Sequence, residues 1–109
     1  MLVKLAQNYN MLVRIVKMEF QSDKVNDFLS FFDTVKEAIA SFEGCLGMKL
    51  MQDQANSSII FTYSHWENQD ALNKYRDSEL FGSVWPIVKP WFNAKPEAWS
   101  LDTYFEQFR

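Results

Sequence analysis

The sequence predicts an α+β fold, the ferredoxin-like plait, in which a four-stranded antiparallel sheet carries all of its helices on one face. Three observations support this prediction. Apolar residues recur with a period of two in four segments, and at three- and four-residue spacing in three others. These segments follow in the order β-α-β-β-α-α-β. This order divides into two βαβ-like halves, and right-handed connections within each half bring their strands into one sheet. The length of 109 residues suits a single domain.

The first strand is predicted over residues 11–20, and the first helix over residues 22–43. We expect Ser22 or Asp23 to cap the start of this helix, and Gly44 to end it in a left-handed turn. The apolar residues of the helix recur at its own spacing: Val25, Phe28, Leu29, Phe32, Val35, Ile39 and Phe42.

A hairpin follows, with strands predicted over residues 46–53 and 58–65 and a polar loop between them. The next helix is predicted over residues 69–77. Asn68 stands directly before it and is expected to be its N-cap, because a short polar side chain can accept a hydrogen bond from the first helical turn.

The last helix is predicted over residues 79–92, with Ser78 as its N-cap. Pro86 and Pro90 fall inside this range and are expected to bend the helix. The final strand is predicted over residues 98–105.

These elements define a single domain over residues 11–105, followed by a short tail over residues 106–109. Residues 1–10 precede the first strong pattern as an N-terminal extension, apolar at first and then polar. The extension is either an extra strand or arm, or a consequence of the choice of start site.

The second face of the predicted sheet is also rich in apolar residues, although a chain of this length has no helices left to cover it. Leaving five large apolar side chains exposed there would forgo roughly 7–15 kcal/mol. That is comparable with the whole stability of a small domain, about 5–15 kcal/mol. We therefore predict a homodimer through this open sheet face. The five residues are Val13, Ile15, Met51, Ile59 and Phe61.

Composition excludes several function classes. Eleven basic against fourteen acidic residues give a net charge of −3 without a basic run, which argues against nucleic-acid binding. The single histidine and single cysteine cannot build the usual zinc cluster within one chain. Three glycines form no phosphate-binding loop. With one cysteine and no apolar run long enough for a membrane span or signal peptide, we expect a cytoplasmic protein without membrane contact.

Short motifs stand at the joints of these elements: EGCLG at 43–47, YSHWE at 63–67, DAL at 70–72 with Tyr75, and SELF at 78–81. Together with the order of the elements, they resemble the antibiotic biosynthesis monooxygenase superfamily. The resemblance covers about residues 11–105. Members commonly carry glutamate where this chain has Ser64, and an aromatic residue where it has Met48.

The resemblance implies a dimeric α/β barrel, in which the open faces of two sheets meet and each subunit holds a pocket between its sheet and its helices. It also implies a cofactor-independent monooxygenase acting on an electron-rich aromatic such as a quinol or an anthrone. Tyr75 would hydrogen-bond a substrate oxygen, and further aromatic residues would form stacking walls. The alternative is that these aromatic residues only fill the layer between helices and sheet. The wall residues are Trp66, which with Tyr75 is also a candidate for catalysis, and Phe28, Phe32, Phe81 and Trp85.

Two other residues are candidates for catalysis, each with a structural alternative. Arg14 could stabilise a phenolate or reduced oxygen, or it could form a salt bridge at an interface. His65 is the only side chain that titrates near neutral pH without a perturbed environment, so it could act as a general base. It could equally be a strand-end residue that faces a partner subunit or solvent.

Haem degradation, a known activity of the superfamily, is not expected here. The positions that resemble the haem-buckling tryptophan and the iron-ligating histidine of those relatives are Tyr75 and Trp85, and tryptophan cannot bind iron. We therefore expect no cofactor and no metal. Two hypotheses are favoured: an oxygenase that needs only its substrate and oxygen, and a non-catalytic dimer that binds a small aromatic ligand. Haem binding through a tyrosine ligand is a third, less favoured alternative.

Overall fold

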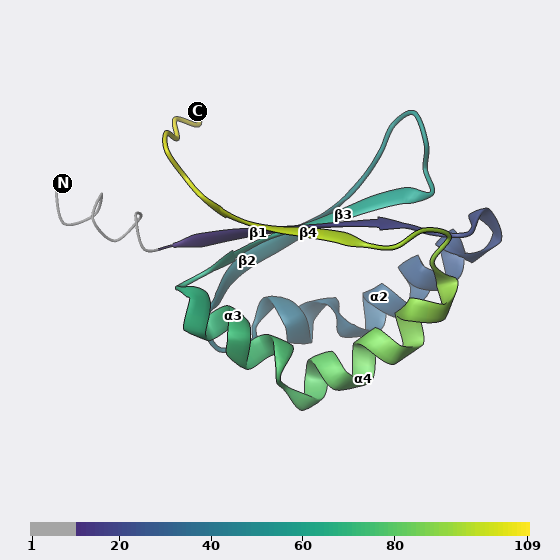
Figure 1. Ribbon diagram of the computed structural model, residues 1–109, viewed down its shortest axis with the longest axis horizontal. Helices are drawn as coiled ribbons and strands as arrows, with labels where there is room; N and C mark the ends of the chain where they lie inside the picture. Colours follow the sequence, from purple (N-terminus) through teal and green to yellow (C-terminus); the bar gives the residue numbers. More distant parts are fainter. Residues whose placement is uncertain (1–10) are drawn as a thin grey trace, which may run out of the picture.

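The computed structural model describes residues 11–109, so the predicted extension over residues 1–10 lies outside the described residues. The chain forms a four-stranded antiparallel sheet with all helices on one face (Figure 1), which confirms the predicted ferredoxin-like plait. In order, the strands, α-helices and 3₁₀ helices (η) are β1 (Leu12–Glu19), η1 (Ser22–Lys24), α2 (Val25–Ala40), β2 (Cys45–Gln52), β3 (Ile59–Trp66), α3 (Gln69–Arg76), α4 (Glu79–Val88), η2 (Lys89–Trp91) and β4 (Glu97–Asp102).

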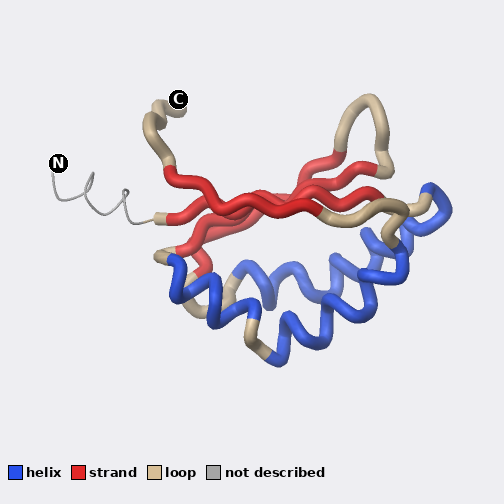
Figure 2. Tube along the Cα trace, viewed as in Figure 1, coloured by secondary structure: helices blue, strands red, loops and turns tan. Residues whose placement is uncertain are grey.

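The spatial order of the strands is β2-β3-β1-β4, so β1 and β3 are central. Figure 2 shows the helices of residues 11–109 as one layer beneath the sheet, and none of them lies on the opposite side. The register of β1 against β3 pairs Met18 with Ile60, and both side chains are buried in the main core below the sheet. Phe20 stacks on Phe28 of α2 at 4.4 Å between ring centroids, which joins the first helix to the sheet.

The two shorter helices begin as predicted. The Asn68 side chain accepts a hydrogen bond from the Ala71 N–H, and the Ser78 side chain accepts one from the Phe81 N–H. Each bond satisfies a backbone donor that the first helical turn leaves without a partner. The two caps therefore fix the joint between β3 and α3 and the joint between α3 and α4.

The first helix differs from its prediction at both ends. Ser22 and Asp23 lie inside the short helix η1, and neither caps α2 with its side chain. The helix ends at Ala40, and a turn separates it from Gly44, which adopts the expected left-handed conformation with a φ of 85°.

The elements near the C-terminus are shorter than predicted. The helix expected over residues 79–92 divides into α4 and η2, with Pro86 inside α4 and Pro90 inside η2. Strand β4 ends at Asp102 rather than at residue 105, because Asp102 pairs with Leu12, the first residue of β1. Beyond that point β1 offers no partner for continued pairing.

Gly44 provides a test of the joint between the first helix and β2. A Cβ atom there would lie 2.5 Å from the Ala71 Cβ, and the backbone φ disfavours any other residue. We expect Gly44→Ala to lower the free energy of unfolding by about 2–5 kcal/mol, from backbone strain and overpacking together. Urea denaturation measures this loss.

Gly82→Ala is the matched control. Gly82 lies within α4, and a Cβ atom there would meet nothing within 4 Å. Because alanine favours helix more than glycine does, this variant should gain about 0.5–1 kcal/mol. Equal losses in both variants would contradict the role assigned to Gly44.

The open face, which we define as the side of the sheet turned away from the helices, keeps several apolar residues in contact with solvent. Met51, Trp99 and Leu101 are 38%, 41% and 43% exposed. Val13 was predicted to be exposed but is only 6% exposed, because it lies between His65 on β3 and Leu101 on β4. The predicted exposure of this face is therefore confirmed for Met51 and wrong for Val13.

Candidate functional site

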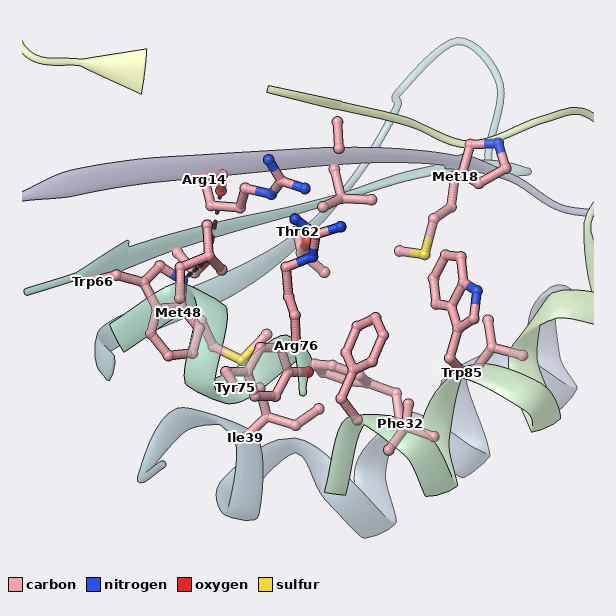
Figure 3. A pocket seen from close by; sticks show the side chains of 18 of the residues that line it. Arg14, Met18, Phe32, Ile39, Met48, Thr62, Trp66, Tyr75, Arg76 and Trp85 are labelled. Atoms are coloured by element: carbon pink, nitrogen blue, oxygen red, sulfur yellow. Dashed lines mark hydrogen bonds between the residues drawn. The ribbon is translucent and has the colours of Figure 1, made fainter. Parts of the chain in front are cut away.

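A cavity of about 380 Å³ lies between the sheet and the helix layer, within the range usual for small-molecule sites. All four strands contribute to its roof, and α2, α3 and α4 form its floor (Figure 3). Most of its lining is apolar. The helix–sheet layer of this chain is therefore not filled completely by its own side chains.

Tyr75 contributes a phenol to the floor of the cavity from the last turn of α3. Its ring stacks on Trp66 at 5.0 Å and meets Phe81 and Phe42 edge-on at 5.4 and 5.5 Å. Burial, with a smaller contribution from Cys45, raises the pKa of the Tyr75 phenol to about 12. At neutral pH the hydroxyl therefore carries its proton and can donate a hydrogen bond.

The Tyr75 hydroxyl forms no hydrogen bond with any residue between 11 and 109. The aromatic residues around it fix the ring but leave the oxygen without a protein partner. A ligand oxygen in the cavity is therefore a suitable acceptor for this donor.

Trp66 is almost fully buried at the end of β3 and forms a wall of the cavity. Its indole N–H donates to the Ser64 hydroxyl at 2.9 Å, and that hydroxyl donates in turn to the Arg14 carbonyl at 3.5 Å. Since its only polar atom is already engaged, Trp66 offers a ligand a flat ring rather than a hydrogen bond. Serine at position 64 thus has a structural role in holding the indole.

Arg14 points from β1 toward the cavity, as its position beside Val16 and Met18 predicted (Figure 3). Its guanidinium donates to the Ser100 hydroxyl on β4 at 2.9 Å. Burial, and then the positive charge of Arg76, lower the pKa of Arg14 from its ordinary value. The group nevertheless stays protonated at neutral pH, since arginine does not lose its charge in proteins.

Arg76 also lines the cavity, although it is not among the site residues predicted from the sequence. It is the last residue of α3, where a cation is stabilised by the helix dipole without any ligand. Its position next to Tyr75 in the sequence was the one indication that it could belong to the site. That position does not reveal that its side chain reaches the same cavity as Arg14.

Besides Trp66, the four other residues predicted as walls all line the cavity: Phe28, Phe32, Phe81 and Trp85. Phe81 and Trp85 stack nearly parallel on α4, with their centroids 5.7 Å apart and their planes 11° apart. On α2, the rings of Phe28 and Phe32 are 5.8 Å apart. The cavity therefore offers several flat aromatic surfaces to a planar ligand.

His65 is not brought to the cavity. Along β3 it alternates with Trp66 and Ser64, so its side chain lies on the open face. The sequence predicts this face, because His65 is an even number of residues from Ile59 and Phe61. There its Nε2 shares a hydrogen bond of 2.8 Å with the Tyr63 hydroxyl. A ligand held between sheet and helices would not reach this histidine.

Within residues 11–109, no three metal-ligating side chains come together in a way that could hold a metal ion. No helix in the described part of the chain is long and apolar enough to cross a bilayer.

Comparison with known proteins points to one family. A family model described as "Antibiotic biosynthesis monooxygenase" matches residues 11–84. The sequence has no significant match among curated proteins.

Several solved structures share the fold. A conserved protein from Methanosarcina mazei Go1 superimposes with a TM-score of 0.84 at 18% identity, over 90% of this chain and 97% of that one. A structure described as an antibiotic biosynthesis monooxygenase gives 0.79 at 17% identity, over 84% and 97%. A Mycobacterium tuberculosis protein gives 0.80 at 14% identity, over 88% and 97%.

Proposed function

Because this chain belongs to the antibiotic biosynthesis monooxygenase family, we propose that it is a cofactor-independent monooxygenase acting on an electron-rich aromatic small molecule. A quinol or an anthrone has the required chemistry. The observation that carries the proposal is the cavity itself, in which a protonated phenol, a guanidinium and several aromatic walls face one apolar space.

In this proposal the planar substrate stacks between the aromatic walls, and its oxygen accepts a hydrogen bond from Tyr75. Arg14 stabilises the anion that forms when the substrate loses a proton to water at the mouth of the cavity. Trp66 excludes water and fixes the plane of the ring. These three residues are the catalytic candidates. His65 is left out, because it lies on the other face of the sheet.

The reaction balances without a further reductant. The substrate anion passes one electron to dioxygen, which gives a substrate radical and superoxide, and these combine into a peroxide. The peroxide takes up a proton and then loses water to leave a carbonyl group on the ring. One oxygen atom ends in the product and the other in water, and both reducing equivalents come from the substrate. The protein contributes orientation, anion stabilisation and a dry environment.

We further propose that two chains pair through the open face to form a dimeric barrel, with residues 11–105 as the domain that dimerises. Members of this family are typically dimeric. Trp99 and Leu101 on β4 add exposed apolar surface to Met51, and isolated domains rarely keep such patches in water. Beyond β4 the chain rises on the same side of the sheet (Figure 1), and its aromatic residues are also exposed: Tyr104, Phe105 and Phe108.

One observation favours a second function, binding without catalysis. Among the described residues that line the cavity, none is a histidine, and Glu97 is the only carboxylate. The described lining therefore holds no histidine that could act as a general base, and a protein of this kind could store or carry an aromatic ligand.

Oxygen uptake by the purified, metal-free protein separates the two functions. We expect turnover with at least one member of a panel of quinols and anthrones, accompanied by a quinone-type product that carries one atom from ¹⁸O₂. Binding of such compounds without oxygen consumption would instead support the carrier function.

A further inference from the structure

Two of the chain's three arginines, Arg14 and Arg76, line one cavity although they come from different elements, β1 and the end of α3. Figure 3 shows both guanidinium groups directed into the space beneath the sheet, one above the other. They are close enough for the charge of Arg76 to act on the pKa of Arg14. Arg14 is half-buried and Arg76 is exposed, so the two cations meet where a largely apolar cavity opens to solvent, and their mutual repulsion favours an anion between them.

The described part of the chain supplies no such anion. Its ion pairs join Lys24 to Asp27 and Lys36 to Asp33, all away from the cavity. Glu97 is the only carboxylate among the described lining residues. It forms no ion pair with Arg14 or Arg76, and in the sheet register it lies opposite Lys17.

The hydrogen bonds of the two side chains lead to the same conclusion. Arg14 donates to one neutral hydroxyl, that of Ser100, and Arg76 donates to no residue between 11 and 109. A guanidinium has five N–H donors in a planar fork, so most of the donors directed at this cavity have no acceptor from the described chain.

We propose that Arg14 and Arg76 together bind a carboxylate that is carried by the aromatic ligand of this cavity. The proposal rests on the proposed function only in assigning an aromatic ligand to the cavity. A carboxylate suits two guanidinium groups because its oxygens accept paired hydrogen bonds from each fork. The aromatic ring then extends toward Trp66 and Tyr75. Unlike an anion formed during reaction, this charge is present before any chemistry begins.

The test compares 2-naphthoate with 2-naphthamide by isothermal titration calorimetry at pH 7, because the two probes share a ring system and differ in charge. We expect the wild-type protein to bind the carboxylate about 10- to 100-fold more tightly than the amide, as for a charge-assisted contact. Arg14→Gln and Arg76→Gln should each reduce this preference to about threefold or less. Arg109→Gln, an equal change of charge in the exposed tail, should leave the preference intact.

The outcomes separate this proposal from the proposed function. If the wild-type protein bound both probes with equal affinity, the proposed carboxylate site of Arg14 and Arg76 would be wrong, while an aromatic-binding function would still stand. This comparison uses only the wild-type protein, so it does not depend on whether a variant folds. Failure of both probes to bind would overturn both. A carboxylate preference that depends on both arginines, in a protein that consumes no oxygen with any quinol or anthrone, would support the pair and contradict the oxygenase.

Discussion

Replacing Tyr75 with phenylalanine is expected to lower kcat for oxygen consumption by about 10²–10³-fold, the usual effect of removing one donor to a developing anion. The variant keeps the ring that stacks on Trp66 at 5.0 Å, so the shape of the cavity is preserved. The removed hydroxyl has no protein partner among residues 11–109, so its loss should not destabilise the fold. Steady-state oxygen uptake measures the effect.

KM should change much less than kcat, because the stacking walls that bind the ring in the ground state remain. Tyr104→Phe is the matched control, since Tyr104 is fully exposed beyond β4 and lies outside the cavity. It should retain wild-type turnover. If Tyr75→Phe kept full kcat, the hydroxyl would have no part in the reaction, and the assignment of Tyr75 as the donor would fail.

The fold was predictable because its elements repeat a simple pattern along the sequence. Alternation in β1 and β3 and helical spacing in α2 fix which side chains share a face, whatever the exact ends of each element. The errors fall at boundaries. Whether Ser22 caps α2 or lies within η1 depends on how the chain leaves the sheet, and the end of β4 depends on where β1 begins.

The sequence predicts those residues of the candidate site whose position depends only on which face of a single strand or helix they occupy. Arg14 and Trp66 lie on the helix face because of their parity in their strands, and the aromatic walls follow from helical spacing. Parity also placed His65 on the opposite face, which separates it from the cavity.

Arg76 could not be predicted in the same way. Its approach to Arg14 depends on how α3 packs beneath the sheet, and no local pattern encodes that packing. At the end of a helix an arginine has an ordinary stabilising role, so its residue type alone does not indicate a ligand. A site whose residues come from two elements far apart in the sequence is therefore the hardest kind of site to predict from sequence patterns.

The proposed dimer predicts a large effect for Phe61→Asp. Phe61 lies on β3, a central strand, with its side chain on the open face. In a symmetric dimer the introduced carboxylate would be buried twice, once from each chain. Because taking an ion out of water costs several kcal/mol even with the opposite charge of Lys17 beside it, the two carboxylates together should weaken association by roughly 10³-fold or more. Sedimentation velocity at micromolar concentration should then show a dimer for the wild type and a monomer for the variant.

The single chain should tolerate this substitution, because Phe61 lies opposite Lys17 in the β1–β3 register and the two charges would pair across the strands. Ile87→Asp is the matched control. Ile87 is 45% exposed on α4, on the helix side of the molecule, so the same change in residue type should leave the dimer intact. A wild-type protein that sediments as a monomer would contradict the pairing of open faces. The apolar residues of that face would then need a different partner.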